Sequence, residues 1–441
     1  MQYNETGGGN NTQIGSYSES IRIYKVQEII RGAFMKNIGV LSVILIVILI
    51  GVYSQFESMA QDQLTKIQQD NLNFYQQREM AASQEIKVKL QSMRELIKAK
   101  KYSFEVGYTT AMGYSIEQIT GLVEPPDLNE QIMKQNEKAK QLMQMQVESV
   151  TLGTCSASAS SFDWRKDNGT TSVRDQENCG SCWAFATCGA YEGNYRIINS
   201  LAIDCSEQQI LDCNPWGYDC YGGWWAFQYF IDHGVTKESD YPYTATKGTC
   251  NTSVTVPYKA LSWGYVGSST GVPSSTFIKQ ALCQYGPLAV GVYATALFQV
   301  YQSNVFNETV NAWAASTNYN LYESVRPANN RVYFCTQSGT TGPTEPIWPL
   351  PTSSNPQPTV NDGTVTWQYW GGGAVNHGVT LIGWDDSKNA WLIKNSWGTG
   401  WGDTCGYGSE RGYMWITYTS DNIGYAAAWV QAVKKNGGCC Q

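Results

Sequence analysis

The fold of this chain is decided by the stretch Gln176-Glu177-Asn178-Cys179-Gly180-Ser181-Cys182-Trp183-Ala184-Phe185. We expect Cys182 in the first turn of a helix, where the positive end of the helix dipole lowers the pKa of a thiol. The side-chain amide of Gln176 and the backbone N–H of Cys182 can supply two donors to a developing oxyanion. Gly180 lets the backbone turn tightly just before the cysteine. The stretch therefore predicts a nucleophilic cysteine.

A thiolate nucleophile needs a base, and the chain contains only two histidines. His377 lies in the apolar run 375–384, which we expect to be a buried strand, and Asn395 follows in the segment 393–402. His233 ends a helical pattern and precedes a glycine, so we interpret it as structural. A single buried cysteine is usually an inert small side chain, so the prediction depends on the combination of these residues.

The Cys-Gly-Ser-Cys-Trp sequence at 179–183, with the histidine and asparagine segments, resembles the motifs of the papain-like cysteine peptidases, the family of papain and the cathepsins. The resemblance implies a cysteine endopeptidase in which Cys182 attacks a peptide carbonyl. His377 forms the thiolate–imidazolium pair, and Asn395 orients the imidazole. Gln176 completes the oxyanion hole.

The same resemblance implies polypeptide substrates and gives further residues a role in binding them. Gly223 would hydrogen-bond to the substrate main chain, and Trp224 would line the pocket for the second side chain before the scissile bond. Trp397 would shield the histidine–asparagine hydrogen bond from water. The expected substrate-binding set is Gly222, Gly223, Trp224 and Trp397.

The chain has thirteen cysteines, which favours an oxidising compartment. The resemblance pairs Cys179 with Cys220 and Cys213 with Cys250. The partners of eight cysteines stay open: Cys155, Cys188, Cys205, Cys283, Cys335, Cys405, Cys439 and Cys440.

The fold implied by the resemblance is α+β with two subdomains, a helical left half and a β-barrel-like right half. In the family the histidine and asparagine follow the cysteine by about 130–150 residues, and here about 60 residues are extra. We place them at 311–370, where short β-branched and aromatic runs alternate with turn residues and predict a small all-β module. The catalytic domain would then comprise residues 161–310 and 371–441.

The 311–370 segment resembles modules of phage tail and virion proteins, and more loosely the small chitin-binding modules. Two interpretations of its Trp and Tyr side chains stay open: they stack on the sugar rings of a glycan, or they form the core of a tiny domain. The first leads to an alternative function, a surface or virion attachment protein in which proteolysis is secondary or lost.

An uncharged apolar run at 37–56 approaches the roughly 20 residues needed to cross a bilayer. The polar segment 1–36 is long for a signal peptide and no clean small-residue cleavage site follows the run, so we favour an uncleaved transmembrane anchor over a cleaved signal. Lys and Arg precede the run and are missing from its near flank. The positive-inside rule then puts the N-terminus in the cytoplasm and the peptidase in a secretory lumen, at the cell surface or on a virion.

We expect residues 57–160 to be a helical region followed by a linker. Ile86, Leu90, Met93 and Ile97 form an apolar stripe on one helical face. The segment is either a solvated stalk or a propeptide that blocks the cleft of a zymogen, as in the papain-like family. We expect cleavage in the small polar stretch 151–160.

The remaining composition excludes several functions. A net charge of −7 without basic clusters argues against nucleic-acid binding. The chain shows no metal-ligand spacing and no phosphate-binding glycine loop, so we expect neither a metal ion nor a cofactor.

Overall fold

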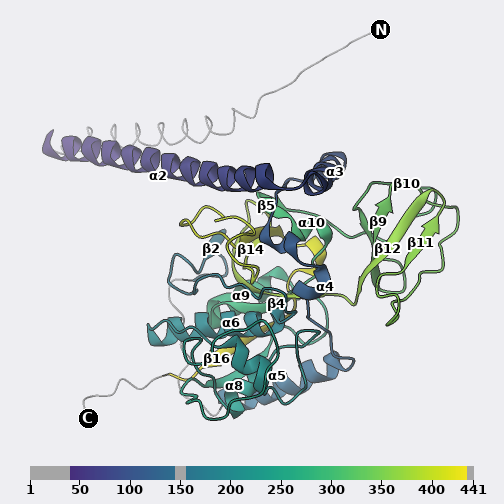
Figure 1. Ribbon diagram of the computed structural model, residues 1–441. Helices are drawn as coiled ribbons and strands as arrows, with labels where there is room; N and C mark the ends of the chain where they lie inside the picture. Colours follow the sequence, from purple (N-terminus) through teal and green to yellow (C-terminus); the bar gives the residue numbers. More distant parts are fainter. Residues whose placement is uncertain (1–39, 145–154, 435–441) are drawn as a thin grey trace, which may run out of the picture. The chain divides into compact units, whose positions relative to one another are not determined.

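The computed structural model describes residues 40–144 and 155–434 (Figure 1). The chain forms two compact units, one up to Gln69 and one from Asp70 onward. The described part of the first unit belongs to helix α2 (Val40–Ala81). No helix in the described ranges is long and apolar enough to cross a membrane, and the first three residues of the anchor expected at 37–56 lie outside those ranges. Helix α2 continues past the apolar run into a polar segment rich in Gln.

The core of the second unit is an eight-stranded sheet. Its strands are β3 (Ala260–Tyr265), β16 (Tyr425–Ala432), β4 (Leu288–Val292), β13 (His377–Asp385), β14 (Ala390–Lys394), β15 (Tyr413–Thr417) and β6 (Val305–Phe306) in that order, with β2 (Ser161–Asp163) beside β13. Strand β13 is antiparallel to both β4 and β14, and its first eight residues are buried. This explains why the sequence of β13 is a continuous apolar run rather than an alternating one.

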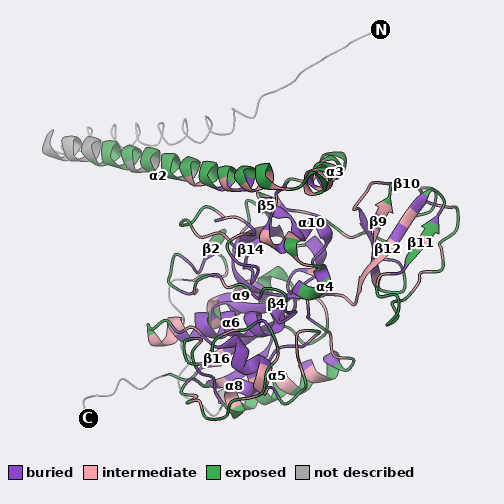
Figure 2. Ribbon diagram, viewed as in Figure 1, coloured by how far each residue is buried: buried purple, intermediate pink, exposed green. Residues whose placement is uncertain are grey.

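Helix α6 (Cys182–Asn199) packs on this sheet and is buried from its first residue to Tyr195 (Figure 2). The helix and strand β13 approach closely because small residues face each other. A Cβ added at Gly189 would lie 2.4 Å from Thr380 Oγ1. The other helices of this part are α7 (Glu207–Cys213), α8 (Phe227–Asp232), α9 (Ser275–Tyr285) and α10 (Ala296–Gln299). The expected α+β architecture is confirmed.

The second unit also contains the region before the catalytic core. Its elements are α3 (Gln84–Lys100), β1 (Glu105–Val106), η1 (Thr110–Gly113), α4 (Ile116–Ile119) and α5 (Leu128–Gln144), and β1 pairs with β5 (Tyr301–Ser303). Ser83 caps α3 and separates it from α2. Leu90 and Met93 of the expected apolar stripe are buried in the main hydrophobic core, as is Leu96. Ile86 and Ile97 are partly buried and pack against that core. Helix α3 is therefore not a solvated stalk.

Residues 318–372 form a separate small sheet, visible in Figure 1 as β9, β11 and β12. Its strands pair in the order β11-β12-β9-β8, with bounds β8 (Ser324–Val325), β9 (Arg331–Gln337), β11 (Thr359–Asp362) and β12 (Val365–Gly372). Two further short strands of this segment, β7 (Asn318–Tyr319) and β10 (Gly339–Thr340), pair with each other. Tyr319, Tyr333 and Trp367 are buried in a core of its own, with Trp313 and Trp348 packed against it. Its aromatic rings thus serve mainly as the core of the module.

Four disulfide bonds join cysteines of the described ranges: Cys155–Cys283, Cys179–Cys220, Cys188–Cys205 and Cys213–Cys250. Two of them are the pairs expected from the sequence. Among the described cysteines, Cys182, Cys335 and Cys405 carry free thiols. Cys439 and Cys440 lie outside those ranges.

Candidate active site

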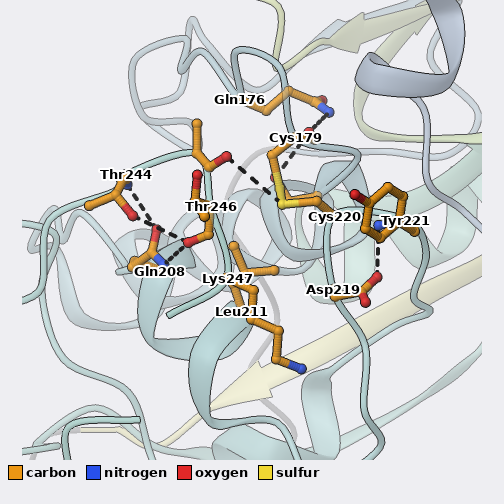
Figure 3. The surroundings of a disulfide bond; sticks show 12 residues. Gln176, Cys179, Gln208, Leu211, Asp219, Cys220, Tyr221, Thr244, Thr246 and Lys247 are labelled. Carbon is orange, nitrogen blue, oxygen red and sulfur yellow. Dashed lines mark hydrogen bonds between the residues drawn. A yellow bond between two sulfur atoms is a disulfide. The ribbon is translucent and has the colours of Figure 1, made fainter. Parts of the chain in front are cut away.

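Cys182 is the first residue of α6, and the turn before it is fixed from two sides. The N–H of Gly180 donates to the carbonyl of Cys220 at 2.9 Å, and a Cβ on Gly180 would lie 2.4 Å from that oxygen. The Cys179–Cys220 disulfide closes the same turn (Figure 3). The turn therefore requires glycine at position 180.

His377 and Asn395 form a buried pair beside this helix start. Nε2 of His377 lies 2.7 Å from Oδ1 of Asn395. Because the amide oxygen only accepts, Nε2 carries the proton and Nδ1 keeps its lone pair. Nδ1 has no hydrogen-bond partner in the described part of the chain. The next residue, Gly378, is so close to the helix that a Cβ on it would lie 3.2 Å from the carbonyl oxygen of Cys182. The start of the strand that carries His377 thus lies against the first turn of the helix that carries Cys182.

Gln176 is oriented by a fixed set of contacts. Its Oε1 accepts from the hydroxyl of Ser396 at 2.8 Å, which directs Nε2 the other way. Nε2 donates to the carbonyl of Cys179 at 2.7 Å (Figure 3) and to the carbonyl of Ile119 at 3.2 Å. The Ile119 oxygen also accepts from Nε1 of Trp397 at 3.0 Å. A peptide carbonyl from upstream in the chain therefore occupies one of the two donors assigned to an oxyanion, the side-chain amide of Gln176.

The residues after Ile119 continue across the site, and we call residues 119–123 the covering segment. The N–H of Leu122 donates to the carbonyl of Asn376 at 2.9 Å. Gly223 donates to the carbonyl of Gly121 at 2.9 Å and accepts from Val123 at 3.0 Å, in a parallel bridge. Leu122 lies in the same apolar cluster as Trp224. The covering segment thus pairs with Gly223, which was expected to bind a substrate main chain.

The close approach of the covering segment to the cleft depends on glycine residues in the segment and in the cleft. A Cβ on Gly121 would lie 1.8 Å from the carbonyl oxygen of Gly180, and one on Gly222 would lie 2.6 Å from Cγ2 of Val123. A Cβ on Gly223 would lie 2.5 Å from the ring of Trp183. The covering segment can lie this close only with glycine at position 121.

Trp224 and Trp397 are both buried, and each makes an indole hydrogen bond. Nε1 of Trp224 donates to the hydroxyl of Tyr265 at 3.0 Å. The ring of Trp397 lies 4.6 Å from that of His377, centroid to centroid, and covers one side of the His377–Asn395 pair. His233 is exposed at the C-terminal end of α8, and its ring lies 4.9 Å from that of Tyr229.

Burial keeps both reactive groups neutral in this state. It raises the pKa of the Cys182 thiol to about 11, although backbone N–H groups, including those of Gly378 and Gly121, oppose the effect. It lowers the pKa of His377 to about 4, although Asn395 opposes this shift. The lower thiol pKa expected from the helix dipole is not found, because the loss of solvent outweighs the dipole. No ion pair is favoured while the site is covered.

A buried thiol at a helix start, beside a histidine–asparagine pair on the neighbouring strands, is the arrangement of a papain-like site. The family model described as papain family cysteine protease matches residues 158–324 and 358–432, more than half of the chain. The chain belongs to the papain family of cysteine proteases. The match is interrupted between 324 and 358, inside the segment expected as an insertion.

Individual relatives agree with this assignment. The chain is 30% identical over 268 residues to a cathepsin L-like proteinase of Fasciola hepatica, covering 59% of this chain and 61% of that protein, less than two thirds of its length. It is 43% identical over 150 residues to stem bromelain of Ananas comosus, covering 33% of this chain and 68% of that protein. The structure of digestive procathepsin L2 from Tenebrio molitor shares the fold, with 22% identity and a TM-score of 0.51 over 82% of this chain and 93% of that one.

Sequence reasoning missed the covering segment. The sequence predicts a possible propeptide within residues 57–160, but not which of its residues contact Gln176 and Gly223. These contacts use main-chain atoms of the segment, so the only signal in the sequence is Gly121, one of 42 glycines in the chain.

Proposed function

We propose that this protein is a cysteine endopeptidase in which Cys182 is the nucleophile and His377 the general base and acid. Asn395 orients the imidazole, and Gln176 stabilises the oxyanion. The observation that carries the proposal is the His377 ring, whose Nε2 is held by Asn395 while Nδ1 has no partner in the described ranges. The next residue, Gly378, lies against the start of α6.

The reaction follows from these positions. His377 Nδ1 takes the thiol proton, and the sulfur attacks the scissile carbonyl. The oxyanion accepts from Gln176 Nε2 and from the N–H of Cys182. The imidazolium gives its proton to the leaving amine, and a thioester remains on Cys182. Water, deprotonated by His377, then releases the acid product and restores the thiol.

The enzyme would be made as a zymogen in which the covering segment occupies the cleft. Support comes from the Ile119 carbonyl, which accepts hydrogen bonds from both Gln176 and Trp397. A substrate carbonyl needs this position, so the segment must leave before catalysis. We expect the separating cleavage within 151–160, of which 151–154 lie outside the described residues. The disulfides support a secretory-type, extracytoplasmic compartment.

The test uses the full chain and its Cys182→Ala variant. After activation, the wild type should hydrolyse peptide substrates and react with a thiol-directed covalent inhibitor, and the variant should do neither. N-terminal sequencing of the active species should find a start within 151–160. Equal turnover by the variant would refute the assignment of Cys182.

Glycan binding by residues 311–370 stays a prediction. The burial of Trp367 and Tyr333 favours a structural use of the aromatic rings. Deleting 311–370 and measuring glycan binding and proteolysis separately tests this alternative. Lost glycan binding with retained proteolysis would support an adhesive role.

A further inference from the structure

The small sheet reaches the covered site through a pair of amides. Nε2 of Gln357 donates to Oε1 of Glu117 in α4 at 2.5 Å. Oε1 of Gln357 accepts from Nε2 of Gln368 in β12 at 2.8 Å. Because Gln368 occupies the oxygen, the Gln357 amide has a fixed orientation and presents its N–H donors to Glu117.

This amide pair is attached firmly to the catalytic sheet. Trp370 follows Gln368 in β12, and its Nε1 donates to the carbonyl of Ala294 at 3.0 Å. The N–H of Ala294 donates to Oδ1 of Asn376, the residue before His377, at 2.6 Å. Hydrogen bonds therefore fix the position of Gln357 and Gln368 relative to His377.

The direction of the covering segment shows which side of the cleft the pair faces. Gly121 and Val123 bond to Gly223, the residue expected to hold the substrate before its scissile bond. Ile119 places its carbonyl at the Gln176 amide, one of the two donors assigned to the oxyanion. Glu117, two residues earlier in the chain, lies beyond them. The amide pair thus faces the side of the cleft that receives substrate residues after the scissile bond.

We propose that Gln357, held by Gln368, recognises a hydrogen-bond acceptor on the substrate, such as a glutamate or aspartate side chain, about two to three residues beyond the scissile bond. Glu117 occupies this place in the covered form. The substrates would be polypeptides that extend well past the cleaved bond, and the inserted sheet would form a wall of the cleft. The proposal deepens the peptidase function and rests on it.

The experiment compares two kinds of substrate on the activated enzyme. One carries a fluorogenic amine directly after the scissile bond and has no residues beyond it. The others are internally quenched peptides of one sequence, with Glu, Ala or Lys at the second or third position after the bond. Gln357→Ala and Gln357→Glu are tested beside Gln337→Ala, an exposed glutamine of the same sheet whose Nε2 donates to Thr364.

For the wild type we expect kcat/KM to be about fivefold higher for the Glu peptide than for the Ala peptide, as for one charge-assisted hydrogen bond near solvent. Gln357→Ala should make kcat/KM equal for the Glu and Ala peptides. Gln357→Glu should make the Lys peptide the better substrate, and Gln337→Ala should leave the preference for the Glu peptide unchanged. The proposal would be overturned if the wild type cleaved the Glu, Ala and Lys peptides with equal kcat/KM. It would also be overturned if Gln337→Ala and Gln357→Ala changed these values equally. Failure of the peptidase function itself would appear differently, as no cleavage of the short substrate.

Discussion

Replacing Gly121 with alanine should open the covered site without altering the catalytic residues. The new Cβ would lie 1.8 Å from the Gly180 carbonyl oxygen, and real Cβ contacts below 3.0 Å essentially never occur. The covering segment must therefore move away by more than 1 Å, roughly, on the geometry of normal contacts. This displacement breaks the two hydrogen bonds that Gly121 and Val123 make with Gly223.

The size of the effect follows from those bonds. Each contributes about 0.5–1.5 kcal/mol, so the closed state should lose about 1–3 kcal/mol. The open population then rises about 5- to 150-fold. The thiol reacts as a thiolate. With a pKa of about 11, the covered thiol is almost entirely protonated at neutral pH. Labelling therefore proceeds through the open form.

The assay is the rate at which a thiol-directed probe labels Cys182 in the uncleaved chain. Gly113→Ala is the matched control, because it lies in the same region and no atom lies within 4 Å of its added Cβ. We expect faster labelling of the Gly121 variant alone. Equal rates for the wild type and the Gly121 variant, or equal acceleration by both variants, would refute the account of the covering segment.

Three further predictions follow from the same structure. The pKa of His377 is lowered to about 4 in the covered form, so the open form binds a proton more readily; covering should be stable above about pH 6.5 and weaken as the pH falls toward 4. Amide hydrogen exchange of residues 119–123, corrected for its intrinsic pH dependence, should therefore become faster as the pH falls from about 6.5 toward 4. His377→Gln should remove this pH dependence. Gln176→Ala should lower kcat about 10²- to 10³-fold in steady-state kinetics, and an unchanged kcat would exclude it from the oxyanion hole. Arg165→Leu leaves the buried Asp163 carboxylate without its 2.8 Å partner and should cost about 3–5 kcal/mol in urea unfolding; a loss below about 1 kcal/mol would contradict a buried pair.

The catalytic residues could be predicted from sequence because their chemistry restricts their identity. Only two histidines were available, and His377 lies in a mostly apolar run without charged residues, as in a strand buried on both faces. The position of the insertion could also be predicted from the sequence. It follows from a spacing that is too long and from a change in composition, and the family match breaks inside that segment.

The parts that could not be predicted depend on contacts between distant residues. Nothing local to Cys188 or Cys205 indicates that they pair, and Cys155 joins a partner 128 residues away. The thiol pKa was predicted in the wrong direction for the covered form, because the segment that excludes water lies about 60 residues before Cys182 and its effect is not visible in the local sequence.

Residues 119–123 are held mainly by hydrogen bonds of their main chain, and this affects how the region can evolve. Selection acts there on the path of the main chain and on the absence of a side chain at Gly121, while Ile119 and Leu122 need only remain apolar and of similar size. Homologues can therefore diverge in this stretch and keep the same latency. Synthetic peptides designed as inhibitors should likewise owe their potency more to chain direction and one well-placed glycine than to a matching sequence.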